Sequence, residues 1–357
     1  VNDNLSIYGS LRQGIESVSP DGDVDNYVGL RDAYSRIGFA ASGEVSEGLT
    51  GSAKYELGID STTGEIGTLA FDGAGQYGNK QSRVAKIGLS GDFGSVHAGK
   101  MWGLFYNAIA YPVDMYSSYY AGWSTYALFR TSDTLAYSSP TMGGFQFDAG
   151  VSFQKGPEKD GATYGKYGIS PGCSLDYGDD GNPGGSGGDA DAVDCSGTPR
   201  GGGNVYTFTG SWSGGPMTIS LGYEVRGSDD SDDEGALGGG AVSLDLGNLD
   251  LAGQFESVMD GSENNTSGVQ YFEEDASVYN IYAGYTAGDF LYKAKFGEAE
   301  GVTGTFTHLG VDYNIAPSMK FFAEYYQDEG GGFSPLAFDQ GNAEGGSAIT
   351  AGAHYSF

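Results

Sequence analysis

The chain has 357 residues, a formal net charge of −30 and a mean hydropathy of −0.31. So acidic a chain argues against binding nucleic acid or an anionic membrane through basic patches, and no stretch approaches the ~20 apolar residues of a membrane-spanning helix. Its 26 tyrosines and 19 phenylalanines are too many for a disordered chain, and 64 glycines without a triplet repeat exclude collagen. The length fits one large β domain or two ordinary domains.

Segments in which apolar and polar side chains alternate follow one another along the whole chain. In the first segment Leu5 and Leu11 share one face, whereas Arg12 lies on the other. Because the side chains of a strand point alternately to its two faces, each segment predicts a strand with one apolar and one polar face. Sixteen such strands are expected, at 4–18, 34–45, 49–60, 82–91, 95–101, 130–142, 145–155, 204–213, 217–226, 236–246, 249–259, 277–287, 289–299, 304–315, 318–328 and 347–357.

The links between these segments alternate between tight turns and longer, acidic, glycine-rich loops, with one exception at 300–303. Tight turns on one rim and long loops on the other are typical of an outer-membrane barrel. A soluble sandwich or jelly roll would bury a face rich in Val, Ile and Leu, whereas here the apolar faces are rich in Tyr, Phe, Ala and Gly. We therefore predict an all-β fold with one domain over 1–357: a 16-stranded antiparallel transmembrane β-barrel, with lipid outside and water inside.

Two segments stand out from the rest. In the fourth, Arg83 has the same parity as the apolar Ile87, which a β-bulge or burial against a neighbouring subunit would explain. The last segment alternates without a break and ends on Phe357, which marks a closing strand. The first residues, VNDNLSIYG, show no charged-then-apolar leader, so we expect any signal peptide to have been removed.

The link at 102–129 differs from the other loops, because it is dense in aromatic residues and carries Asp114 as its only acid. An aromatic loop that faced water would be a liability, so we expect it to fold inward and narrow the lumen as a constriction loop. Its aromatic rings either stack on sugar rings or pack against the wall, and packing is the simpler interpretation. They belong to Tyr111, Tyr116, Tyr119, Tyr120, Trp123 and Tyr126.

Two stretches and the final aromatic residue resemble a known family. The stretches are SRIGFAASGEVSEGLTGSAKYE at 35–56 and SRVAKIGLSGDFGSVHAGKMWGLFYNAIAY at 82–111. They resemble the general trimeric porins of Gram-negative outer membranes. The resemblance implies a homotrimer among outer-membrane lipid and lipopolysaccharide, through which small hydrophilic solutes and ions diffuse passively, with no cofactor required. It also implies that acids of the constriction loop face an arginine cluster on the opposite wall.

The family's arginines match three positions, each at the start of a strand: Arg36, Arg83 and Arg130. A basic residue early in the family's first strand falls on Ser10 here, and Arg12, two residues on and on the same face, takes its place. Of the family's two loop acids only Asp114 has a counterpart, so the resemblance implies an asymmetric transverse field. Closely placed arginines repel, so inward carboxylates are expected to screen them. The candidates are Glu16, Glu56 and Asp60. The alternative is that the arginines are ordinary exposed rim charges.

The longest loop, 156–203, is acidic and contains both cysteines, Cys173 and Cys195. Two cysteines in one loop of an exported chain predict an intraloop disulfide formed in the periplasm. Nearby carboxylates supply the oxygen ligands that Ca²⁺ prefers, although their spacing matches no EF-hand loop. The candidates are Asp176, Asp179 and Asp180. A weak calcium site and a solvated acidic loop both stay open.

Taken together, the patterns predict a diffusion channel of the bacterial outer membrane and not an enzyme. None of the three histidines, His97, His308 and His354, belongs to a recognisable Ser/His or metal-binding arrangement. Because the chain and its loops are acidic, we expect a preference for cations, against which the arginine cluster argues. A substrate-specific channel for sugars or oligosaccharides is the alternative. Display of the long loops as an adhesin or receptor is a further one.

Overall fold

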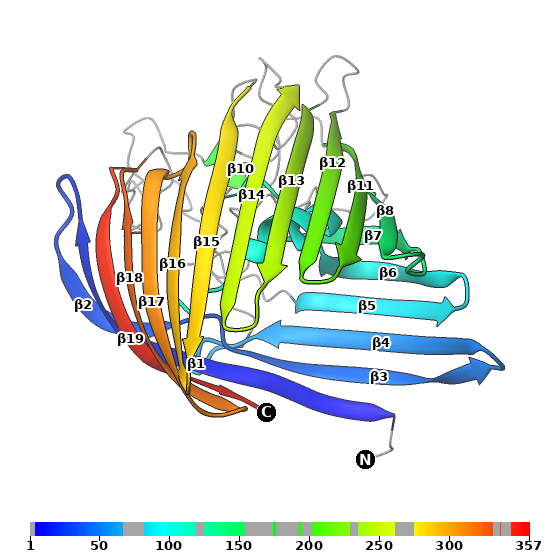
Figure 1. The fold of residues 1–357 in the computed structure, drawn as a ribbon, viewed down its shortest axis with the longest axis horizontal. Helices are drawn as coiled ribbons and strands as arrows, with labels where there is room; N and C mark the ends of the chain where they lie inside the picture. Colours follow the sequence, from blue (N-terminus) through cyan, green and yellow to red (C-terminus); the bar gives the residue numbers. More distant parts are fainter. Residues whose placement is uncertain are drawn as a thin grey trace.

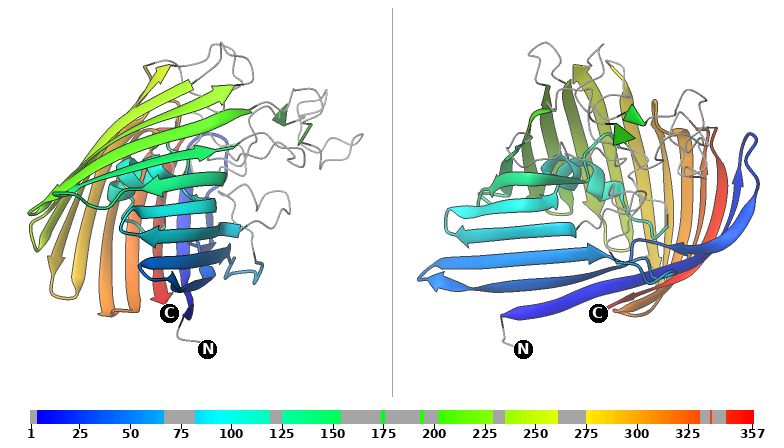
Figure 2. Two further views of the ribbon diagram at one scale, coloured as in Figure 1. Left: turned by 90° about the vertical axis from the view of Figure 1, so that its right-hand side faces the viewer. Right: turned by 180° about the vertical axis from the view of Figure 1, so that it is seen from behind.

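The structure is a computed structural model that describes residues 4–66, 82–118, 125–153, 174–175, 193–194, 202–228, 235–260, 275–330, 336 and 344–357. Within these ranges the chain is almost entirely β-sheet, wound into a barrel (Figure 1). Two short helices, the π-helix η2 (Tyr106–Ala110) and the 3-10 helix η3 (Tyr111–Val113), lie on the inner side of the sheet (Figure 2). No helix in the described ranges is long and apolar enough to cross a membrane.

The wall consists of strands that pair antiparallel with their neighbours. In the first part of the chain they are β1 (Leu5–Pro20), β2 (Tyr27–Asp32), β3 (Arg36–Ser46), β4 (Leu49–Gly58), β5 (Ser82–Gly91), β6 (Gly94–Trp102), β7 (Arg130–Ser138) and β8 (Phe145–Ser152). In the second part they are β11 (Gly202–Gly214), β12 (Met217–Ser228), β13 (Gly235–Asp245), β14 (Leu249–Asp260), β15 (Ser277–Ala287), β16 (Phe290–Ala299), β17 (Gly304–Ala316), β18 (Met319–Asp328) and β19 (Gly346–Ser356). Apart from the wall, β9 (Ser174–Leu175) pairs with β10 (Val193–Asp194).

The ring closes where β1 meets β19. Gly9 and Phe357 exchange two backbone hydrogen bonds there, of 2.9 and 3.1 Å. β1 pairs with β2 through residues 13–18 and with β3 through residues 5–10, so β2 and β3 together form one strand of the wall. Counted in this way, the described residues form a closed antiparallel barrel of sixteen strands, which confirms the predicted fold.

The strand predicted at 34–45 is longer in the structure, because it already begins with β2 at Tyr27. Its two parts are separated at Tyr34, whose φ of 67° is a left-handed conformation that interrupts a strand. Because of this interruption, even-numbered residues such as Leu30 face outward in β2, whereas odd-numbered residues such as Phe39 face outward in β3. For this reason the sequence pattern alone did not reveal β2.

The irregular strand predicted at 82–91 is β5, and a bulge explains its pattern. Glu56 of β4 lies opposite Val84. The next residue of β4, Leu57, lies opposite Ser82. Arg83 is therefore the extra residue of a β-bulge, and its buried side chain points into the barrel. Of the two explanations offered by the sequence, the bulge is the one that the register bears out.

The two faces of the wall differ in polarity as the alternation predicts. On the outside large apolar side chains are exposed, among them Ile15 at 60%, Leu221 at 67% and Ile281 at 62%. On the inside charged side chains such as Glu224 and Lys295 are buried within the barrel. An apolar outer surface around a polar interior suits a wall surrounded by hydrocarbon, in which every backbone polar group is paired along the closed sheet.

Candidate pore constriction

The described parts of the constriction loop, 102–118 and 125–129, lie inside the barrel, as predicted. Phe105 and Ile109 are fully buried and pack on two glycines of the wall, Gly222 of β12 and Gly239 of β13. These glycines lie opposite each other, and we call them the glycine pair. A Cβ atom at Gly222 would lie only 2.9 Å from the Phe105 ring and 3.0 Å from Ile109. Because glycine lacks that atom, the loop can approach the wall closely.

Two buried carboxylates on the wall hold the backbone of the loop. Glu256 of β14 accepts a hydrogen bond of 2.6 Å from the N–H of Tyr126. Glu324 of β18 accepts hydrogen bonds of 2.7 and 2.8 Å from the N–H groups of Ser117 and Ser118. Hydrogen bonds to a carboxylate are stronger than those between neutral groups. The loop is therefore fixed to the wall at two separate strands.

A network of charges balances Glu324. Lys293 of β16 lies 3.1 Å from Glu324 and 2.8 Å from Asp312 of β17. Lys320 of β18 donates to the same Asp312 at 2.6 Å. Removing one partner of a buried ion pair leaves an uncompensated charge, which is strongly destabilising. We therefore expect the loop anchor at Glu324 to depend on these lysines.

Two tyrosines complete the attachment of the loop. The Tyr126 hydroxyl shares its one proton between the carbonyl oxygens of Ser277 and Glu300, which lie 3.0 and 2.8 Å away. The Tyr116 hydroxyl donates to the carbonyl oxygen of His308 at 2.6 Å, and its ring stacks on that imidazole with centroids 3.6 Å apart. Burial raises the pKa of both phenols above its ordinary value, so both remain neutral hydrogen-bond donors.

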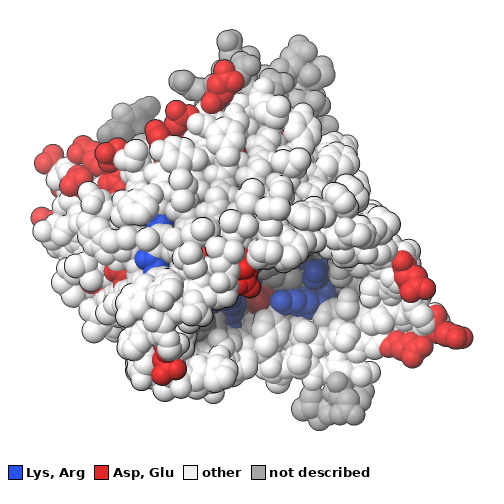
Figure 3. All heavy atoms as spheres, in the orientation of Figure 1, with Lys and Arg blue, Asp and Glu red and all other residues white. Residues whose placement is uncertain are grey.

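Between the loop and the wall around β1 lies a cavity of about 720 Å³. Six basic and two acidic side chains line it. They are Arg12, Arg36, Lys54, Arg83, Arg130, Lys320, Glu56 and Asp114. Figure 3 shows basic side chains in the hollow of this face and acidic ones mainly along its edges. The lining is therefore net basic, although the chain as a whole is strongly acidic.

Two of the arginines are held by specific partners on the wall. Arg83 pairs with Glu56 at 2.7 Å, and the Tyr8 hydroxyl donates to the same carboxylate at 2.9 Å. The guanidinium of Arg130 lies 3.8 Å from the centre of the Trp102 ring, which is a cation–π contact. These contacts keep the charged groups at the cavity surface in defined positions.

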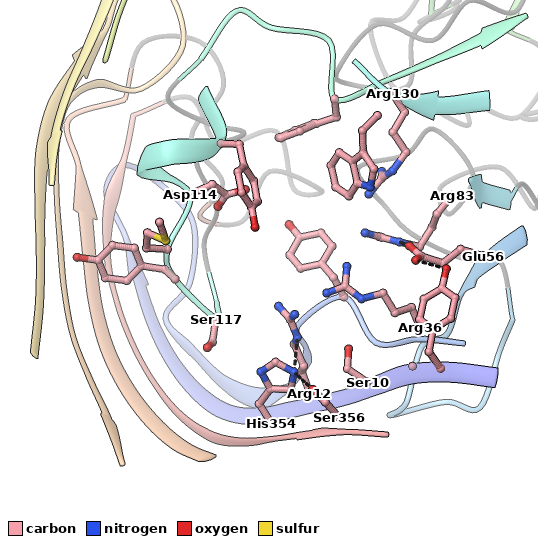
Figure 4. A pocket seen from close by; sticks show the side chains of 18 of the residues that line it. Ser10, Arg12, Arg36, Glu56, Arg83, Asp114, Ser117, Arg130, His354 and Ser356 are labelled. Atoms are coloured by element: carbon pink, nitrogen blue, oxygen red, sulfur yellow. Dashed lines mark hydrogen bonds and ion pairs between the residues drawn. The ribbon is translucent and has the colours of Figure 1, made fainter. Parts of the chain in front are cut away.

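Asp114 lies on the loop side of the cavity, across from the arginines (Figure 4). It follows η3, and its carboxylate accepts a hydrogen bond from the Tyr106 hydroxyl. Opposite charges on two sides of a narrow passage create a field across it, and low-dielectric walls strengthen that field. With one acid facing several arginines, the arrangement is asymmetric.

The cavity brings together most of the residues predicted for the constriction. These are Arg12, Arg36, Arg83, Arg130, Glu56 and Asp114, together with the aromatic Tyr111 and Tyr116. Glu16 lies outside the lining, because Arg31 and Tyr27 of β2, a strand that the sequence did not reveal, bind its carboxylate. Asp60 instead holds a turn, in which it accepts a 2.8 Å hydrogen bond from the Thr62 N–H.

Several important residues were not singled out from the sequence, namely the lining lysines Lys54 and Lys320 and the anchors Glu256 and Glu324. In the sequence these residues are marked only by a position on the polar face of a predicted strand. Many other residues have such a position, so it did not single them out. Other predicted residues lie outside the described ranges: Tyr119, Tyr120, Trp123, Cys173, Cys195, Asp176, Asp179 and Asp180. Where the structure describes the chain, no three His, Cys, Asp or Glu side chains are grouped to hold a metal ion.

Two relatives with similar sequences are named as porins. A monosaccharide porin of Halomonas sp is 29% identical over 170 residues, which are 44% of this chain and 44% of that protein. A chitoporin of Vibrio furnissii is 29% identical over 153 residues, 42% of this chain and 40% of its own length. The matched regions thus span less than half of these relatives.

The fold resembles that of solved porins. The anion-selective porin from Comamonas acidovorans has a TM-score of 0.69 at 15% identity, covering 99% of both chains. OmpF of Salmonella typhi, in complex with daunomycin, has a TM-score of 0.68 at 15% identity, covering 99% of this chain and 98% of its own. Residues 2–332 match the family model described as Gram-negative porin. This chain therefore belongs to the Gram-negative porin family and is a β-barrel of the outer membrane.

Proposed function

We propose that this porin is a water-filled channel through which small hydrophilic solutes and ions diffuse passively. One observation carries the proposal: the constriction loop is fixed inside the barrel and borders a cavity lined by charged side chains. The width beside the loop limits the size of a solute, and the charges around it set the ion preference. Planar bilayers test this, since purified protein should give discrete current steps in salt solution. Folded, inserted protein without conductance would refute it.

The charges of the lining favour anions in the narrowest part. Six basic side chains face two acidic ones, and Glu56 is already paired with Arg83. Exposed charges farther away than the Debye length, about 8 Å at physiological salt, are largely screened. The negative charge of the loops therefore acts weakly on an ion beside the arginines. The sequence predicts a preference for cations, and that prediction is untested. From the charges of the lining we propose a preference for anions instead.

Reversal potentials in a salt gradient decide between the two preferences. With KCl at different concentrations on the two sides, an anion-selective potential supports the dominance of the lining charges. A cation-selective potential supports the dominance of the acidic loops instead. Removal of residues 156–203 provides a further comparison, because it reduces the acidic charge and leaves the arginines of the cavity lining in place.

A sugar-specific channel is the second candidate function. Aromatic side chains line the same cavity, among them Tyr8, Tyr34, Trp102 and Tyr111. Two relatives are named for a monosaccharide and for chitin. Stacking of sugar rings on such side chains would give saturable binding. Block of the single-channel current by oligosaccharides at increasing concentration would support this candidate, and a current reduced only in proportion to solution viscosity would count against it.

We also propose that the protein assembles as a homotrimer. The outer face of β3 to β6 has a shallow apolar groove lined by small side chains, including Ala41, Ala53, Ala85 and Ala98. Small side chains let two walls approach closely within a membrane, where association depends on packing. Chemical cross-linking in mild detergent should yield dimers and trimers. Channels that close in three successive current steps would support the proposal, whereas a strictly monomeric species would contradict it.

A further inference from the structure

Ser10 is a polar side chain that the channel function does not explain. It lies on the inner face of β1 with 3% of its surface exposed, and it lines the cavity. Among the described residues its hydroxyl has no hydrogen-bond partner. Burying a hydroxyl without a partner is unfavourable, so such a group in a functional cavity points to a ligand or solvent that completes its hydrogen bonds.

The surroundings of Ser10 supply further hydrogen-bond donors. Across the sheet it lies directly between Arg36 of β3 and Ser356 of β19. Arg12 lies two residues further along the same face of β1, and its Nε–H donates to His354 Nε2 at 3.2 Å. The Ser356 hydroxyl lies 3.0 Å from the same nitrogen, so His354 positions both side chains. Figure 4 shows these side chains together at one edge of the cavity. Two hydroxyls and two guanidinium groups thus face the same space.

The carboxylates that line the cavity are engaged elsewhere. Glu56 binds Arg83 and Tyr8, and Asp114 binds Tyr106. A guanidinium offers planar pairs of N–H donors that match the oxygens of a phosphate or a carboxylate, and the Ser10 hydroxyl adds a donor from a third direction. A halide accepts hydrogen bonds without such directional preference. The donor set therefore fits an oxyanion better than chloride.

We propose that Ser10, Arg12, Arg36 and Ser356 form a binding site for the oxyanion group of small anionic solutes, a phosphoryl or carboxylate group. The inference rests on the proposed channel function and adds a substrate class to it. A solute that carries such a group stops briefly at the constriction before it passes. The neutral form of the same solute passes without stopping. The site thereby raises the local concentration of these anions at the narrowest point.

Single-channel recordings in planar bilayers test the site. Inorganic phosphate, glucose 6-phosphate, succinate and glucose are added in turn at constant KCl concentration. We expect the oxyanions to reduce the current saturably and glucose to leave it unchanged at the same concentrations. Block by the phosphates alone assigns the site to phosphoryl groups, and block by succinate alone assigns it to carboxylates.

Variants of Ser10 separate binding from folding. Ser10→Ala should weaken the block about tenfold, the usual loss of a hydrogen bond to a charged group, and Ser10→Thr should retain it. Ser220→Ala is the matched control, because Ser220 is a buried, inward-facing serine on β12 outside the cavity lining. Equal block of the wild type and Ser10→Ala would overturn the inference and leave the channel intact. Only the absence of conductance would refute the channel itself.

Discussion

The glycine pair offers a direct way to move the constriction loop a short distance away from the wall. In Gly222→Ala the new Cβ atom would lie 2.9 Å from the Phe105 ring and 3.0 Å from Ile109. Carbon atoms in ordinary contact are about 3.5–4.0 Å apart. The loop must therefore move away from the wall by roughly 0.5–1 Å, into the cavity, because the β12 backbone is held by hydrogen bonds on both sides. Overpacking of this kind costs about 1–3 kcal/mol.

The expected result is a smaller single-channel conductance with a largely unchanged barrel. Gly240→Ala is the matched control, because its Cβ atom would meet Leu221 on the outer face at 3.4 Å, an ordinary contact. Both variants are recorded in planar bilayers at several KCl concentrations. Their stability is compared by the temperature at which each loses its β-sheet structure. If Gly222→Ala and Gly240→Ala both conduct like the wild type, the glycine pair does not set the position of the loop.

Two further predictions rest on the structure and one rests on the sequence. Glu256→Ala removes the acceptor for the Tyr126 N–H, at a cost of about 1–3 kcal/mol, so the current through the open channel should become noisier than in the wild type. Arg130→Gln removes one positive charge from the lining and should move the reversal potential towards cations, and an unmoved potential would show that this charge does not act on the ions. Cys173 and Cys195 should react with an alkylating reagent after reduction and not before it, as expected of a disulfide in an exported chain.

The wall of the barrel could be predicted from the sequence because its cause is local. Each strand between lipid and water must alternate, so the pattern is repeated in sixteen segments and survives single irregularities. The exceptions are places where the backbone departs from the period of two. At Tyr34 a left-handed residue hides the start of a strand, and at Arg83 a bulge reverses the parity. Such departures depend on how the strand pairs with its neighbour. The alternation along one segment of the sequence carries no information about that pairing.

The constriction could be predicted only in part, because its geometry depends on contacts between distant residues. The aromatic composition of the loop indicated that it folds inward, but the wall residues that receive it carry no local signal. Gly222 is one of many glycines, and Glu324 is one of many inward-facing acids. The net charge likewise describes the whole chain, whereas ions respond to the few charges within a Debye length of their path. For this reason the net charge of the chain could not predict the basic lining of the constriction.

The central claim is that a loop fixed inside a water-filled barrel limits what passes through it. The most direct test is the single-channel current of the wild type in the presence of neutral polymers of increasing size. Polymers small enough to enter should lower the conductance, and those above a sharp size limit should leave it unchanged, as expected for a pore with one narrow zone. A conductance that no polymer size affects, or the absence of any current from folded protein, would contradict the claim.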